Sequence, residues 1–75
     1  MRLVITKQRE SSFYDLEFFN YDNSLALGGT DTVLPTLSVA ATIVRNYPTV
    51  NVVLNNVSLA DRQHITQILG AKETR

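Results

Sequence analysis

The 75-residue chain contains no cysteine and only one histidine, His64. Without cysteine it forms no disulfide and no thiolate zinc site, and one histidine does not make a histidine-rich metal site. A domain of this length buries only roughly 60% of the surface that its unfolded chain exposes, so small domains often rely on a disulfide, a metal or a partner chain. We therefore expect no metal and no cofactor, and we expect very good packing or self-association to supply stability.

An excess of basic residues is also missing. Lysine and arginine together number 7, aspartate and glutamate together number 7, and the formal net charge is zero. Nucleic-acid affinity comes largely from neutralising phosphates, which usually requires a basic excess. The balance therefore argues against a nucleic-acid partner, while a net charge near zero favours association between copies.

Long hydrophobic runs are absent too. No stretch approaches the roughly 20 apolar residues of a membrane-spanning helix. The first ten residues hold one apolar run, Leu3-Val4-Ile5, which is too short for a signal-peptide core. We therefore expect a cytoplasmic protein that makes no membrane contact.

The N-terminal third reads as strands. Arg2–Lys7 is rich in β-branched and apolar residues, and Phe13–Tyr21 is the most aromatic segment of the chain. The polar turn between them is too short for a crossover, so the two segments predict an antiparallel hairpin. Ser24–Leu27 predicts a short third strand that ends at Gly28-Gly29.

Val33–Asn46 reads as a helix. Its apolar residues recur at spacings of three and four, with Pro35 in the first turn and Pro48 ending the helix. Thr30-Asp31-Thr32 offers three candidate N-caps. The expected apolar stripe comprises Leu34, Leu37, Ala41 and Val44, flanked by Val33, Ala40 and Ile43.

The C-terminal third predicts one strand and one helix. Thr49–Leu54 holds the continuous run Val52-Val53-Leu54, which indicates burial on both faces. Ser58, with Asp61 three residues later, predicts the start of a helix whose apolar stripe comprises Ile65, Ile68 and Leu69. Gly70 suits the end of this helix, and residues 70–75 are expected to fray.

Together these segments predict one α+β domain over residues 1–75. The order is strand, strand, an optional third strand, helix, strand and helix. A strand, a helix and a further strand in succession usually form a right-handed crossover. We therefore expect a small mixed sheet of three to four strands with both helices on one face.

The aromatic strand is the first candidate site. With a period of two, Tyr14, Leu16 and Phe18 fit the core, opposite Leu3 and Ile5. This leaves an interaction surface formed by Phe13, Phe19 and Tyr21, with the carboxylates Asp15 and Glu17 between them. Exposed aromatic residues favour a protein interface, although the rings can also pack locally or stack nucleobases. The two carboxylates would repel a phosphate backbone, which favours a protein partner.

The predicted central helix is the second candidate. Between Thr32 and Ala60 the only charged residue is Arg45, so the outer face of the helix is weakly polar. Either this helix is simply the most buried one, or its outer face contacts another chain. The candidate oligomer face comprises Thr36, Ser38, Thr42 and Arg45.

Two further features of the sequence give weaker support for a functional site. Gly28-Gly29 precedes a helix, but neither phosphate-binding fingerprint is present and no lysine follows, so a turn with a helix cap explains these residues. His64 has Asp61 three residues before it, an arrangement that can orient an imidazole for acid–base work. A lone histidine beside Arg62 and Gln63 is more typical of a solvated helix surface, so we predict no catalytic residues.

The sequence thus favours a non-catalytic protein-binding or assembly module that self-associates. Its small size is typical of an accessory protein or inhibitor from a phage or plasmid. The alternative is a nucleic-acid-binding accessory protein, which needs Arg2, Lys7, Arg9 and Arg45 to converge. An enzyme completed at an oligomer interface would need His64 of one copy to meet a carboxylate or hydroxyl of another.

Overall fold

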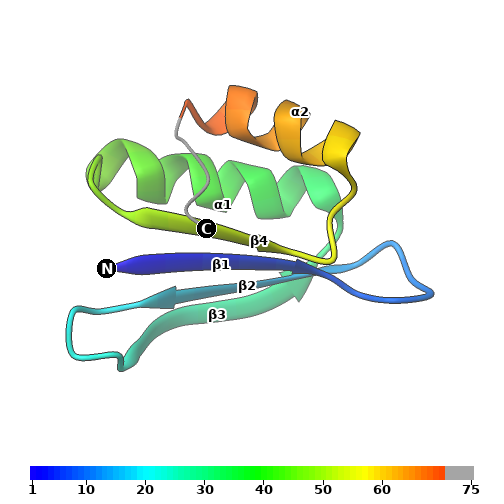
Figure 1. Cartoon of the computed structure of the whole chain (residues 1–75). Coiled ribbons are helices and arrows are strands. Elements are labelled where there is room, and N and C mark those ends of the chain that lie inside the picture. Colours follow the sequence, from blue (N-terminus) through cyan, green and yellow to red (C-terminus); the bar gives the residue numbers. More distant parts are fainter. Residues whose placement is uncertain (71–75) are drawn as a thin grey trace.

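The computed structural model describes residues 1–70. One sheet carries the strands in the order β3-β2-β1-β4, and both helices cover the same face of it (Figure 1). None of the helices within the described range is long and apolar enough to cross a membrane. The expected α+β fold is confirmed, and its third strand is present. The elements, in chain order, are β1 (Arg2–Lys7), β2 (Tyr14–Phe19), β3 (Leu25–Asp31), α1 (Val33–Asn46), β4 (Asn51–Asn55) and α2 (Leu59–Leu69).

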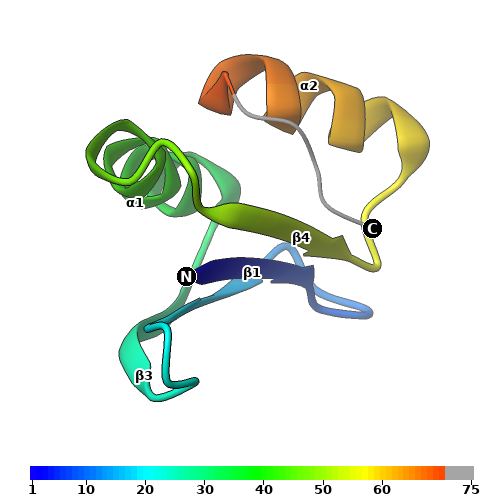
Figure 2. The same ribbon diagram turned by 60° about the vertical axis from the view of Figure 1, so that its left-hand side comes forward.

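The sheet is mixed, as predicted. β1 pairs antiparallel with β2, and β2 pairs antiparallel with β3, whereas β1 pairs parallel with β4. The parallel pair arises because the chain crosses over the sheet as α1 before it returns as β4. In the rotated view, β3 forms one edge of the sheet and β4 lies toward the other (Figure 2).

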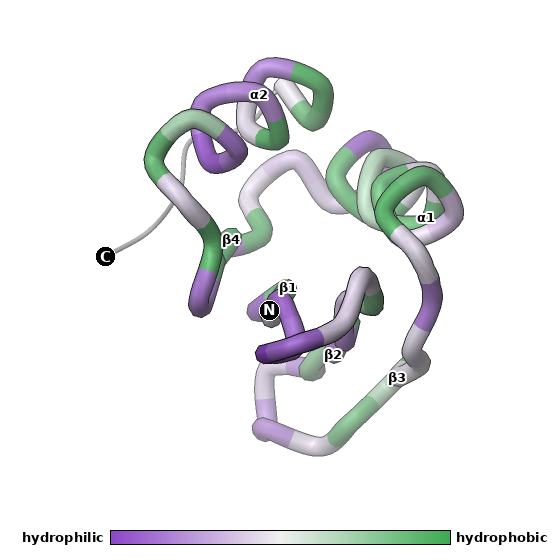
Figure 3. Tube along the Cα trace, turned by 90° about the vertical axis from the view of Figure 1, so that its right-hand side faces the viewer, coloured by the Kyte–Doolittle hydropathy of each residue, from purple (hydrophilic) through white to green (hydrophobic). Residues whose placement is uncertain are grey.

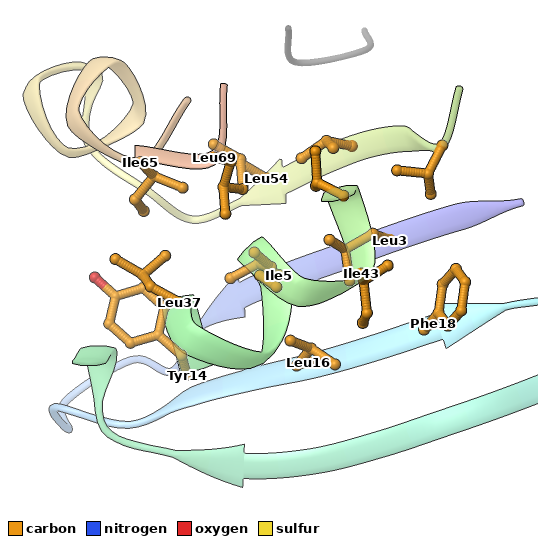
Figure 4. Packing of buried hydrophobic residues seen from close by; sticks show 14 of the residues in the cluster. Leu3, Ile5, Tyr14, Leu16, Phe18, Leu37, Ile43, Leu54, Ile65 and Leu69 are labelled. Carbon is orange, nitrogen blue, oxygen red and sulfur yellow. The ribbon is translucent and has the colours of Figure 1, made fainter. Parts of the chain in front are cut away.

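The core lies between the sheet and the two helices. Leu3 pairs with Phe18 and Ile5 with Leu16, so their side chains share the face that the helices cover, as the period of two predicts (Figure 4). Leu3 and Ile5 are fully buried, and Tyr14 joins them at one end of the core. From the helices, Leu37, Ala40, Ile43, Val44, Ile65 and Leu69 complete this cluster.

The orientation of α1 differs from the predicted one. Leu34, assigned to the apolar stripe, is 76% exposed, while Ala40 is fully buried. Thr36, assigned to the outer face, is only 4% exposed, and its Oγ1 lies 3.4 Å from the carbonyl oxygen of Asp31, to which it donates. The side of α1 that faces the sheet therefore carries Thr36, Leu37 and Ala40, and only Thr32 separates this helix from β3.

β3 is longer than predicted. It continues through Gly28 and Gly29 to Asp31, because Gly28 pairs with Glu17 and Gly29 with Leu16 of β2. The expected turn at the two glycines was therefore wrong. Thr32 is the N-cap of α1, but its side chain makes no capping hydrogen bond.

β4 also differs from its prediction. Val52 and Leu54 are buried, whereas Val53 points to the uncovered face and is only half-buried. The expected burial on both faces was wrong because the helices cover a single face.

The start and end of α2 agree with the sequence. The Oγ of Ser58 accepts a hydrogen bond from the amide of Asp61 at 3.3 Å, and Gly70 ends the helix with a φ of 67°. Ile65 and Leu69 are buried, but Ile68 is 48% exposed and does not belong to the stripe. Of the tail predicted to fray, Gly70 is the helix cap and residues 71–75 lie outside the described residues.

Candidate functional site

The three aromatic residues proposed as an interaction surface do not form one patch. Phe13 immediately precedes β2 and is 44% exposed, whereas Tyr21 follows the other end of β2 and is 80% exposed. A six-residue strand separates them by roughly 20 Å. Phe19 is half-buried, and the guanidinium of Arg2 lies 4.5 Å from the centre of its ring. The three rings therefore lie in separate regions of the surface.

The two carboxylates lie on the face of the sheet that the helices leave uncovered. An Oδ1 of Asp15 accepts hydrogen bonds from Thr30 Oγ1 at 2.6 Å and from Gln8 Nε2 at 3.0 Å. These bonds stabilise the charged form, so they lower the pKa of Asp15, chiefly through Thr30. Glu17 is exposed beside it. Around these two carboxylates the uncovered face is thus polar, and Asp15 is hydrogen-bonded.

The remaining members of the predicted oligomer face of α1 are exposed and bonded to one another. Thr42 Oγ1 donates to the carbonyl of Ser38 at 3.1 Å, and Arg45 Nη2 lies 3.5 Å from Thr42 Oγ1. Thr36 is buried and faces the other way. What remains is a small polar strip in which Thr42 and Arg45 already have hydrogen-bond partners within one copy.

The basic residues of the nucleic-acid alternative are dispersed. Arg2 points to the uncovered face with Phe19, whereas Lys7 lies at the other end of β1 near the ring of Tyr14. The ammonium of Lys7 donates to the carbonyls of Gln8 and Ser11. Arg45 lies on α1. His64 is exposed on α2, and residues 1–70 contain no group of three potential metal ligands.

The most unusual surface is β3, which forms one edge of the sheet. All seven of its residues are exposed, including Leu25 at 56% and Leu27 at 45%. Its only charged residue is Asp31, at the end of the strand. The hydropathy-coloured trace shows that the first part of β3 is hydrophobic and lies at the edge of the sheet (Figure 3). Edge strands usually carry charges, prolines, a β-bulge or a covering element that hinders pairing with another chain. β3 has a register shift of the bulge type at its Leu25–Leu27 end, but Gly28, Gly29 and Thr30 carry neither a charge nor a proline.

An open groove runs between β3 and α1. Its volume is about 200 Å³, and its walls include Leu16, Leu27, Pro35 and Val39. Gly29 explains the hollow, because it faces the helices opposite Leu16 but has no side chain. A Cβ at this position would meet nothing within 4 Å. The groove is therefore an apolar space left empty by the glycine.

The register shows which backbone groups of β3 are unpaired within the sheet. The amide of Gln8 donates to the carbonyl of Phe13 at 3.0 Å, so Asp15 and Glu17 also direct their backbone groups toward β1. Leu16 and Phe18 consequently bond to β3, through Gly29 and Leu27. The N–H and C=O groups of Gly28 and Thr30 then point outward, away from the sheet.

The opposite edge, formed by β4, is partly covered. The amide of Asn51 donates to the carbonyl of Met1, so the alternate residues Val52 and Leu54 direct their backbone groups outward. Arg62 of α2 covers this edge, since its Nη2 donates to the carbonyl of Leu54 at 3.3 Å and its Nε to that of Val57 at 3.1 Å. The two edges of the sheet are therefore not equivalent.

Sequence reasoning missed the β3 edge because it treated Gly28-Gly29 as a break. The signal that was available is that no residue from Leu25 to Thr30 is charged, whereas sequence reasoning considered only the charge-poor segment from Thr32 to Ala60. Comparison of the chain with protein-family models, with curated proteins and with solved structures gives no match.

Proposed function

We propose that this chain is a non-catalytic protein-binding and assembly module that associates with itself. The observation that carries this proposal is the exposed apolar edge strand β3 beside an open groove. Addition of a strand to such an edge is a common mode of protein recognition, because backbone hydrogen bonds supply affinity and side-chain pockets supply specificity. A cytoplasmic location and a role as an accessory protein remain part of this proposal.

Three properties support self-association over binding to a foreign partner alone. A chain of 75 residues without cysteine gains stability from a partner surface. A net charge of zero leaves no general repulsion between copies. The charge-poor centre of β3 adds no local repulsion when two copies meet there.

The nucleic-acid alternative has no observation in its favour. Arg2, Lys7 and Arg45 lie in three separate places, and the uncovered face of the sheet carries Asp15 and Glu17. The aromatic rings of that alternative are likewise separated along β2.

The test is the absolute mass of the full chain in solution, by light scattering after size exclusion across a concentration series. One copy has a mass of 8.4 kDa. A mass that rises with concentration to twice that value is the expected result. A mass of 8.4 kDa at every concentration up to the millimolar range would overturn self-association.

A further inference from the structure

We infer that the partner of β3 is the β3 strand of a second copy, paired antiparallel about a two-fold axis at Gly28. Leu27 of each copy then fills the groove that Gly29 leaves open in the other. This inference rests on the proposed self-association and specifies its site and register. It would join two four-stranded sheets into one of eight strands, with all four helices on one face.

The backbone fits this arrangement. Gly28 directs its N–H and C=O groups out of the edge of the sheet, as the β2–β3 register requires. In an antiparallel pair, two residues with outward-facing groups that lie opposite each other exchange two hydrogen bonds. A two-fold axis at Gly28 therefore pairs it with its own equivalent and satisfies both groups in each copy.

The side chains fit the same register. With Gly28 opposite Gly28, Leu27 of one copy lies opposite Gly29 of the other, and both positions face the helices. Leu27 is 45% exposed in the single chain, and the space above Gly29 is empty to at least 4 Å from a Cβ position. The exposed leucine and the empty groove are thus complementary under one symmetry operation.

The charges do not oppose it. The only charged residue within β3 is Asp31, three residues from the proposed axis at Gly28, so the two copies of Asp31 lie at opposite ends of the paired strands and do not face each other. Like charges directly opposite each other in adjacent strands would be destabilising.

The partial cover of the β4 edge by Arg62 would favour an assembly of two copies. The only other edge of the sheet is the one whose Leu54 carbonyl is occupied by Arg62. An interface that uses the same strand of both copies closes on itself, whereas pairing of β3 with β4 would generate larger rings or open filaments. Arg62 therefore favours the closed dimer.

Single cysteines test the register, because the chain has no cysteine of its own. Ala26, Leu27, Gly28, Gly29 and Thr30 are replaced by Cys one at a time, and each protein is treated with a short thiol-specific cross-linker. A Cβ at Gly28 would lie 3.3 Å from Cδ2 of Leu25, the movable end of a side chain, so the Gly28→Cys variant is expected to fold. The highest yield of cross-linked dimer is expected at Gly28→Cys, with Leu59→Cys on α2 as the distant control.

A second variant tests the groove. Gly29→Val places a side chain in the empty space, where no atom obstructs a Cβ, and valine is favourable in a strand. The variant should therefore keep the urea midpoint of the monomer while its dimer dissociation constant rises at least tenfold. Leu59→Lys, at a residue that is 70% exposed and outside the interface, should leave that constant unchanged, whereas Leu27→Lys should raise it.

The outcomes separate the two proposals. A dimer by light scattering that cross-links most strongly at a position other than Gly28, or that Gly29→Val leaves intact, would overturn the β3 pairing and leave self-association standing. A chain that is monomeric at every concentration would overturn both. A dimer with maximal cross-linking at Gly28 and loss of association in Gly29→Val would support both.

Discussion

The Nη2 atom of Arg62 donates a hydrogen bond to the backbone carbonyl of Leu54, 3.3 Å away, at the outer edge of β4. The side chain of a helix residue thereby occupies an acceptor that a strand from another chain would need. No comparable side chain covers the centre of β3 at the opposite edge among the described residues. This difference between the edges decides which one is available for pairing.

Replacement of Arg62 by methionine should open the β4 edge. Methionine keeps an unbranched apolar side chain but removes the donors to Leu54 and Val57. Because a hydrogen bond within a protein contributes about 1 kcal/mol net, the free energy of unfolding should fall by roughly 1–2 kcal/mol. The urea midpoint measures this fall, and light scattering should also detect species larger than a dimer.

The matched control is Arg45→Met on α1, whose guanidinium makes, within residues 1–70, a single hydrogen-bond contact of 3.5 Å with Thr42. This variant should keep the midpoint within about 0.5 kcal/mol of the original. Equal effects of the two substitutions would show that Arg62 has no special role at the edge.

The orientation of α1 gives a second prediction. Leu37 is 5% exposed and Leu34 is 76% exposed on the same helix. Leu37→Ala should lower the free energy of unfolding by about 2–4 kcal/mol, because it removes buried apolar surface and leaves a cavity. Leu34→Ala should change it by less than about 0.5 kcal/mol. Urea denaturation of both variants compares them, and a larger loss for Leu34→Ala would reverse the orientation of the helix.

The two helix starts give a third prediction. Ser58 accepts a hydrogen bond from the amide of Asp61, whereas the side chain of Thr32 makes no capping bond. Ser58→Ala should therefore destabilise the domain by about 1 kcal/mol, and Thr32→Ala should cost less than half as much. Thermal or urea unfolding measures both, with equal losses as the contrary result.

The pH dependence gives a fourth prediction. The hydrogen bonds from Thr30 and Gln8 hold the pKa of Asp15 below its ordinary value of 3.8. Because the folded-state pKa is lowered, the carboxylate stabilises the fold above pH 3.8, and this contribution disappears as the pH falls through the lowered pKa.

Carboxyl-carbon NMR titration measures that pKa directly. Thr30→Val should raise the pKa of Asp15 toward 3.8, because it removes the largest cause of the shift. Thr42→Val, on α1, makes the same change in side chain and should leave this pKa alone. An Asp15 that titrates at its ordinary value in the unaltered protein would contradict the hydrogen-bonded arrangement.

The sequence predicted where the strands and helices lie better than it predicted which side of each one is buried. The bounds of β1 and α1 agree with the predicted ranges, because β-branched runs and helix-stopping prolines are local signals. The sequence could not predict which side of α1 faces the sheet. Apolar residues occur on several sides of Val33–Asn46, and the helical period of 3.6 residues does not choose among them. Packing against β2 and β3 makes that choice.

The candidate site was the least predictable part. Glycine weakens a strand on average, so Gly28-Gly29 indicated a break, yet pairing with Leu16 and Glu17 of β2 overrides that preference. The groove exists only because Gly29 faces α1 across the fold. Neither relationship is local in the sequence, and the shielding of Leu54 by Arg62 depends equally on tertiary structure.

Amide hydrogen exchange at two protein concentrations tests the pairing of β3 most directly. The N–H of Gly28 points out of the sheet in a single copy and would be bonded in the dimer, so its protection should rise with concentration. The outward amides of Val52 and Leu54 on β4 serve as internal controls and should show no such rise. The β3 interface would be contradicted if the Gly28 amide exchanged at the same rate at both concentrations, although light scattering detected a dimer at the higher one.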